Sequence, residues 1–326
     1  MLGQNLSKVQ LSDMFSAEQR IRKVTPPTPL ITMEPLNMLL KYQVYLKAES
    51  LLPSGAFKFR GAFNKISWLK ENYGDNVEVV TASSGNHGMA VALSSRLLGL
   101  KATVVVPSIT PEIKKECIRS FGADIIVSGA TYDDSFLEAC RIAEEKGCYY
   151  VHSVSDVEVL GGQGTISLEI IRQLPDVEQI VVPLGGGGLI TGISYAIKQL
   201  KPKTKVCAVM PEHSAVYAKS REAGRLIELR EAYSVADAVI RKTGESYLFP
   251  YIEQNVDEIF TVGEETIKKA VRAGLLYGKL MLEGSGALPL AAAMEGKIDL
   301  HMKTVLVCSG GNIDQAVLQQ CLDAPE

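Results

Sequence analysis

Residues 181–192, VVPLGGGGLITG, join a short apolar run to a helix-forming stretch through four consecutive glycines. The uninterrupted apolar character of the first residues is typical of a strand buried on both faces. Consecutive glycines let backbone N–H groups converge at the start of the next helix, where the helix dipole favours an anion. The stretch matches neither GxGxxG with a downstream acidic residue nor a glycine loop ending in Gly-Lys-Ser/Thr. It indicates a site for one phosphate group; the plainer alternative is a turn that needs glycine for its conformation alone.

Strands and helices alternate on both sides of this loop. Apolar runs predict strands at 77–82, 101–107, 123–129, 179–184, 205–211, 257–262 and 303–309. Helical patterns occupy 86–98, 111–122, 133–146 and 285–294, and a long helix runs through Lys279. Strands that are apolar throughout fit a mainly parallel sheet covered by helices, so the predicted fold class is α/β. The block at 77–151 is expected to form a small inserted domain, with 1–76 and 152–326 forming the large one.

Composition narrows the classes of function. The chain has 326 residues, of which 46% are hydrophobic, so it can bury a large core. A formal charge of -3 with interspersed signs argues against a nucleic-acid partner. The N-terminus lacks a signal peptide and no apolar run is long enough for a bilayer, so we expect a cytoplasmic protein with no membrane partner. Six scattered cysteines and four histidines form no CxxC or similar cluster, so no metal site is expected.

Two more loops follow predicted strands at the edge where open α/β sheets bind ligands. The first, SSGNHG, holds Ser83, Ser84, Gly85, Asn86 and His87 at a helix start, where a small carboxylate would fit. The plainer interpretation is that a serine or the asparagine only caps the helix. The second, CSGGN, ends the last strand with a serine that could equally be a helix cap.

Lys58 lies in PSGAFKFRGA, residues 53–62, between two phenylalanines. A lone lysine with aromatic neighbours is usually a surface lysine over a packed core. The other motifs of the chain change this interpretation. A phosphate loop without a nucleotide motif and a loop suited to a carboxylate together suggest pyridoxal phosphate bound to a lysine amine. In that setting, Ser309 beside the pyridine nitrogen would leave the ring largely neutral, a weaker electron sink that suits β-elimination.

In their order, PSGAFKFRGA, SSGNHG, GGQGT, VVPLGGGGL and CSGGN resemble the fold-type II pyridoxal-phosphate enzymes, in particular the threonine/serine dehydratase and serine racemase group. The resemblance spans nearly the whole chain, from TPPTPLITMEPL at 25–36 to CSGGN at 308–312. It implies a two-lobed fold of mainly parallel twisted sheets flanked by helices, with the 77–151 domain mobile and closing over substrate. It also implies a homodimer and a small hydroxy amino-acid substrate.

The resemblance assigns roles to residues by matching position. Lys58 would hold the cofactor and exchange the Cα proton, Phe57 would pack beside the ring, and Asn86 would hydrogen-bond its hydroxyl. The pyridine nitrogen would bind Ser309, and Glu283 would be the acidic residue near the cofactor. The phosphate would bind at Gly185, Gly186, Gly187, Gly188 and Leu189, and the substrate carboxylate at Ser83, Ser84, Gly85, Asn86 and His87.

The implied reaction is dehydration and deamination of L-threonine or L-serine to a 2-oxo acid and ammonia. Ser84 opens an alternative, because the racemase-like members resemble this chain in having serine there as a second, opposite-face base. A serine racemase, or a racemase or dehydratase acting on 3-hydroxyaspartate, is therefore the second hypothesis. A cysteine synthase and a non-catalytic amino-acid sensor rank lower.

Two positions depart from the group's pattern. Racemase-like members bind a divalent cation through acidic residues at the places of Met210 and Val216, so that site is expected to be absent or rebuilt here. Ala238 stands where the group usually has glycine beside the cofactor, and its methyl group is expected to narrow the pocket.

Overall fold

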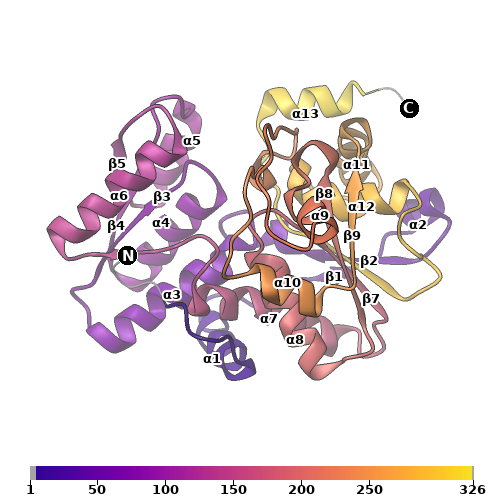
Figure 1. Ribbon diagram of the computed structural model, residues 1–326, viewed down its shortest axis with the longest axis horizontal. Coiled ribbons are helices and arrows are strands. Elements are labelled where there is room, and N and C mark those ends of the chain that lie inside the picture. The colour runs from indigo at the N-terminus through magenta and orange to yellow at the C-terminus, as the bar shows by residue number, and fades with distance from the viewer. Residues whose placement is uncertain (1–4, 325–326) are drawn as a thin grey trace. The chain divides into compact units, whose positions relative to one another are not determined.

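The computed structural model describes residues 5–324, and the chain divides into two compact units. The first unit comprises residues 1–25 and 58–163, and the second comprises residues 26–57 and 164–326. The chain therefore passes between the units three times, after Thr25, at the Phe57–Lys58 peptide bond and after Gln163. Figure 1 shows the elements of both units along the chain.

The first unit is built around a four-stranded parallel sheet of order β5-β4-β3-β6. Helix α3 packs against α4 and α1, and α4 packs against the sheet. The central strands are buried, whereas the edge strand β5 is only partly covered, as the end of a sheet requires. The elements are α1 (Leu11–Ile21), α3 (Lys58–Tyr73), β3 (Glu78–Ala82), α4 (Asn86–Leu98), β4 (Lys101–Val106), α5 (Glu112–Ser120), β5 (Asp124–Val127), α6 (Tyr132–Lys146), β6 (Tyr149–Tyr150) and the start of α7 (Val157–Gln173).

The second unit holds a six-stranded sheet of order β1-β2-β10-β7-β8-β9, parallel except for the β1–β2 pair. Its strands are β1 (Leu30–Ile31), β2 (Val44–Ala48), β7 (Gln179–Pro183), β8 (Lys205–Pro211), β9 (Glu258–Val262) and β10 (Thr304–Cys308). Its helices are α2 (Glu34–Leu40), α8 (Gly188–Leu200), α9 (Val216–Glu222), α10 (Phe249–Asn255), α11 (Glu264–Leu276), α12 (Gly284–Met294) and α13 (Gln315–Leu322), with short 3₁₀ turns at Glu49–Leu51, Glu212–Ser214 and Asp237–Val239.

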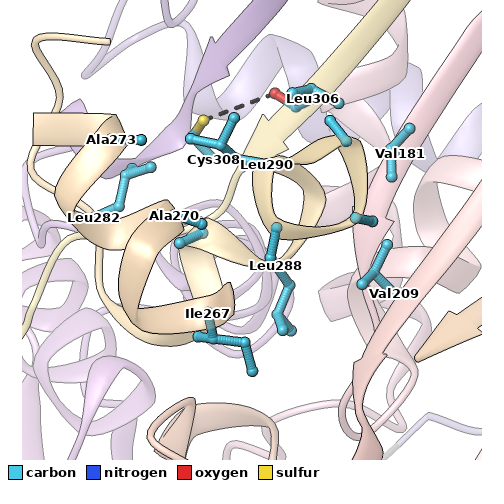
Figure 2. Close-up of a cluster of buried hydrophobic side chains, with 14 of the residues drawn as sticks. Val181, Val209, Ile267, Ala270, Ala273, Leu282, Leu288, Leu290, Leu306 and Cys308 are labelled. Atoms are coloured by element: carbon cyan, nitrogen blue, oxygen red, sulfur yellow. Dashed lines mark hydrogen bonds between the residues drawn. The ribbon is translucent and has the colours of Figure 1, made fainter. Parts of the chain in front are cut away.

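The core of the second unit lies between its sheet and helices α11 and α12. Figure 2 shows Leu288 and Leu290 of α12 beside Val181, Val209 and Leu306 from the strands. Since β7 and β10 are buried at every residue, their unbroken apolar sequences follow from coverage on both faces. The carboxyl ends of these two strands therefore begin their loops from a rigid, fully packed base.

The predicted alternation of strands and helices is confirmed, and several bounds agree to within two residues. The helix expected to run through Lys279 is an exception, because α11 ends at Leu276. The N–H groups of Tyr277 and Gly278 both bond back to the Ala273 carbonyl, and Lys279 takes a positive φ of 55°, which a helix cannot continue. The boundary predicted at 77 and 151 encloses the four strands of the smaller sheet, and the compact unit adds α1, α3 and the first turns of α7.

Candidate active site

The four glycines lie in the second unit, between the carboxyl end of β7 and the start of α8. Gly187 takes φ 95° as the N-cap of α8, a left-handed conformation that favours glycine. A Cβ at Gly185 would lie 2.7 Å from the Cα of Val239, so neighbouring backbone already fills that space. The Tyr217 hydroxyl donates to the Gly186 carbonyl at 3.3 Å and so orients one peptide of the loop. The loop therefore presents the unpaired N–H groups of a helix start on a fixed backbone.

A second feature of this unit joins residues 54–57 to residues 309–312, which follow β10. The Phe57 N–H donates to the Ser309 carbonyl at 2.9 Å, and the Gly311 N–H donates to the Gly55 carbonyl at 2.9 Å. The Asn312 side-chain amide donates to the Ser54 carbonyl at 2.8 Å. Gly55 has φ 76°, and a Cβ there would meet the Asn312 side chain at 2.2 Å. Segments more than 250 residues apart are thus paired, and Lys58 is the next residue along the chain.

Glu283 and Ser309 are neighbours in this arrangement. The Glu283 N–H donates to the Gly310 carbonyl at 3.1 Å, and Glu283 Oε1 would lie 2.6 Å from a Cβ at Gly310. Glu283 and Ser309 are both buried. A Cβ at Gly284 would lie 2.7 Å from the Val235 carbonyl oxygen, so residues 235–239 contact both this cluster and the glycine loop. The second unit therefore brings together Phe57, the glycine loop, Glu283 and Ser309.

Lys58 opens α3 in the first unit. Its Nζ donates to the Ser153 carbonyl at 2.7 Å, and the side chain is half-buried. Phe59 is fully buried and stacks on Phe63, one turn further along α3, with ring centroids 5.5 Å apart. Phe57 belongs to the second unit and is half-buried. The two aromatic neighbours of the lysine therefore have different partners, which the sequence pattern leaves undecided.

The SSGNHG loop connects β3 to α4 in the same unit as Lys58. Ser83, Ser84 and Gly85 are half-buried, whereas Asn86 and His87 are buried at the first turn of α4. A Cβ at Gly88 would lie 2.2 Å from the Ser83 carbonyl oxygen, so the loop folds directly onto the helix. Its residues thus combine two hydroxyl groups with the N-terminus of a helix of 13 residues, an arrangement suited to a carboxylate.

His87 is the most electrostatically perturbed group of this loop. Burial, and next to it the charge of Lys58, lower the pKa of His87 to about 3. Its Nε2 lies 2.9 Å from the Val151 carbonyl, which requires that nitrogen to carry the proton. Its Nδ1 is buried without a hydrogen-bond partner among the described residues. His87 is therefore a neutral imidazole with one open acceptor, near the lysine amine.

Sequence reasoning missed the loop at 152–156, which follows β6 and supplies the acceptor for Lys58. The residues that follow β6 lie at the same sheet edge as the SSGNHG loop, because parallel strands end together. That rule could have identified them. It also missed the buried Lys65, which the helical pattern of α3 presents as an ordinary solvated charge.

Two further features of the described residues concern membrane-spanning helices and clusters of metal-binding side chains. Within residues 5–324, no helix has the length and apolarity needed to cross a membrane. The same part of the chain has no group of three or more His, Cys, Asp or Glu residues placed to hold a metal ion. Met210 and Val216, at the places discussed above, are both fully buried apolar side chains.

The sequence profile of the family described as pyridoxal-phosphate dependent enzymes matches residues 21–310 of this chain. The chain belongs to this family. It is an α/β enzyme that uses pyridoxal phosphate, as the resemblance implied.

Within this family, the chain is similar to threonine ammonia-lyases and to serine racemase. An L-threonine ammonia-lyase of Thermotoga maritima is 38% identical over 97% of this chain and 78% of its own length. A catabolic L-threonine dehydratase of Staphylococcus aureus is 38% identical over 94% of this chain and 90% of its own. Among solved structures, maize serine racemase superposes with a TM-score of 0.89 at 33% identity, covering 96% of this chain and 97% of that one.

The residues described above fit the cofactor of a pyridoxal-phosphate dependent enzyme. The glycine loop offers helix N–H groups to a phosphate, and neighbouring backbone fills the space that a side chain would need. Ser309 directly follows β10, and its carbonyl accepts the N–H of Phe57, the residue before Lys58. The donor set is thus a phosphate site, a serine hydroxyl and a lysine amine, which are the groups that this cofactor requires.

Proposed function

We propose that this enzyme catalyses β-elimination of L-threonine and L-serine, releasing a 2-oxo acid and ammonia. The observation that carries the proposal is the pairing of residues 54–57 with residues 309–312. This pairing joins the reactive lysine, through one peptide bond, to a loop that carries a serine rather than a carboxylate. Bound pyridoxal phosphate supplies an electron sink for the Cα–H bond, and a hydroxyl partner at its ring nitrogen keeps that sink moderate. Relatives named threonine ammonia-lyases support the same reaction.

We assign the residues roles in binding the cofactor, in moving the proton and in binding the substrate. Gly185, Gly186, Gly187, Gly188 and Leu189 hold the phosphate, Phe57 packs beside the ring, and Ser309 hydrogen-bonds its nitrogen. Glu283 lies near the cofactor, and Asn86 bonds the ring hydroxyl. Lys58 holds the cofactor and, once its amine is free, takes the proton from Cα. The loop of Ser83, Ser84, Gly85, Asn86 and His87 binds the carboxylate, mainly through the N-terminus of α4, because His87 is neutral.

Substitution of Lys58 tests the reaction. Lys58→Ala removes the amine that binds the cofactor and accepts the proton, so both the visible absorption band and 2-oxo acid release are expected to disappear. Lys70→Ala, on the same helix, is the matched control and should retain both. A Lys58→Ala protein that still forms 2-oxo acid from threonine at the wild-type rate would refute the proposed role.

A racemase is the second candidate, and Ser84 is the observation that favours it. Ser84 is half-buried in the carboxylate loop of the unit that contains Lys58, and its hydroxyl can serve as a base on the opposite face of Cα. Superposition on serine racemase structures agrees with this alternative. Ser84→Ala should abolish exchange between L- and D-serine while 2-oxo acid formation continues. Assays of 2-oxo acid release and enantiomer exchange with serine, threonine and 3-hydroxyaspartate rank the substrates.

Three further properties belong to this proposal. We propose a homodimer, because Met38, Leu51, Leu276, Tyr277 and Met281 of the second unit are exposed apolar side chains. Light scattering coupled to size-exclusion chromatography tests this assignment. We place the enzyme in the cytoplasm, where its six free thiols stay reduced. The domain at 77–151 is proposed to close over the substrate, and reduced hydrogen exchange in residues 83–87 on addition of serine would reveal this motion.

A further inference from the structure

The loop at residues 152–156 of the first unit is held at both ends by buried side chains. At its start, His152 Nδ1 accepts hydrogen bonds from the backbone N–H groups of Val154, at 3.2 Å, and Ser155, at 2.8 Å. At its end, Asp156 Oδ1 accepts the N–H groups of Glu158, at 3.1 Å, and Val159, at 3.4 Å, and so caps the first turn of α7. The backbone on both sides of the Ser153 carbonyl is therefore tied down.

Asp156 is in turn held by a fully buried lysine from α3. Lys65 Nζ lies 3.0 Å from Asp156 Oδ2 and 3.0 Å from Glu158 Oε2. Asn5 contributes its backbone N–H to Asp156 Oδ2 at 3.2 Å and its side-chain amide to Glu158 Oε1 at 2.9 Å. Asp156 thus joins the loop to α3 through one ionic contact, whereas Glu158 contacts the same lysine without capping the helix.

Lys58 and Lys65 lie on the same helix, two turns apart, and both reach this segment. Lys65 binds the Asp156 end, and Lys58 donates to the Ser153 carbonyl at 2.7 Å. Hydrogen bonds from an ammonium group to a fixed acceptor are among the stronger ones in proteins and favour the charged form of the amine. The position of one carbonyl therefore influences both the direction and the basicity of Lys58.

A stability role alone does not account for the cluster. A buried ion pair contributes little to stability compared with apolar side chains of similar volume. The protein nevertheless places one lysine against two carboxylates at the end of the loop that supplies the acceptor of Lys58. The distinguishing property of the cluster is thus the geometry that it imposes.

We propose that Lys65 and Asp156 are positioning residues that hold the Ser153 carbonyl as the docking point for the free amine of Lys58. This inference rests on the proposed role of Lys58 as the lysine that holds the cofactor and later acts as the base. Each time the amine is freed, the docking point receives it in a fixed orientation and sets the pKa at which it gives up its proton.

The experiment measures the pKa of Lys58 in full-length protein freed of cofactor, by competitive acylation of its amine followed by mass spectrometry. Asp156→Asn and Glu158→Gln form a charge-matched pair, because each removes one negative charge from the same cluster. Only Asp156→Asn breaks the link between Lys65 and the loop. Loss of a charge-assisted hydrogen bond should lower the pKa of Lys58 by about 1 relative to Glu158→Gln.

The outcomes separate positioning from general electrostatics. Equal pKa values of Lys58 in Asp156→Asn and Glu158→Gln would overturn the proposal. Asp156→Ser, which retains a hydroxyl cap for α7, replaces Asp156→Asn if the latter does not fold, and the same result is expected. Lys47→Met is the control for loss of a buried ion pair, because Lys47 Nζ lies 2.6 Å from Glu169 Oε2 in the second unit. This substitution should leave the pKa of Lys58 unchanged. Because the assay needs no turnover, its result is independent of the Lys58→Ala test of the proposed function.

Discussion

The two units hold their candidate functional residues in different ways. The second unit uses backbone: glycines 185, 284, 310 and 311 lie where added side-chain atoms would collide with neighbouring atoms, several of them backbone. The first unit also packs Gly88 against backbone, but side chains orient the groups around Lys58, namely those of His87, His152 and Asp156. A surface made of packed backbone has one shape, whereas a surface made of side chains can adjust. Under the proposed function, the second unit holds a constant cofactor and the first unit binds a substrate that enters and leaves.

The largest expected effect on stability comes from adding a methyl group to one glycine in each unit. Gly185→Ala places its Cβ 2.7 Å from Val239 Cα, so backbone must move, and a destabilisation of about 3 kcal/mol is expected. Cofactor affinity should fall with it, because this loop is the proposed phosphate site. Gly85→Ala is the matched change in the first unit, where nothing lies within 4 Å of the new atom, and it should cost less than about 1 kcal/mol.

Urea unfolding and cofactor titration of the two variants check this contrast. Equal losses of stability in Gly185→Ala and Gly85→Ala would break the distinction between a backbone-built and a side-chain-built surface.

The second effect exploits the buried histidine of the first unit. His87 is neutral in the folded protein because its pKa is lowered to about 3, whereas the unfolded chain protonates it near its ordinary value of 6.5. As the pH falls below 6.5, the unfolded state binds the extra proton, so the free energy of unfolding decreases. Between pH 7 and pH 5 this linkage amounts to about 2 kcal/mol, which His87→Gln should lack.

Urea unfolding at pH 7 and pH 5 measures this difference. A decrease of the same size in wild type and His87→Gln would show that His87 does not carry the pH dependence. His213→Gln controls for loss of an exposed histidine.

The same contrast explains how far the sequence alone could lead. The glycine loop and the strands around it were predictable, because apolar runs and glycine carry local signals of backbone conformation. The partner of Lys58 was not, since Ser153 contributes a backbone carbonyl, which every residue has. Likewise, Lys65 follows an ordinary helical pattern, and only its burial against Asp156 distinguishes it. The pairing of Asn312 with Ser54 depends on tertiary structure across most of the chain.

The smallest effect is expected at Ala238, where the two kinds of surface can be compared within one segment. Its neighbour Val239 packs on Gly185, and Val235 approaches Gly284, so the segment is fixed on both sides while Ala238 itself is exposed. Its methyl group is free to limit the size of the substrate, as the sequence suggested. Ala238→Gly should therefore lower KM for threonine relative to serine by roughly tenfold, the lower end of what one carbon atom in a pocket is worth. Ala223→Gly, at an exposed position after α9, controls for the added backbone freedom. An unchanged ratio of KM values in Ala238→Gly would mean that the substrate lies elsewhere and that this segment supports only the cofactor side.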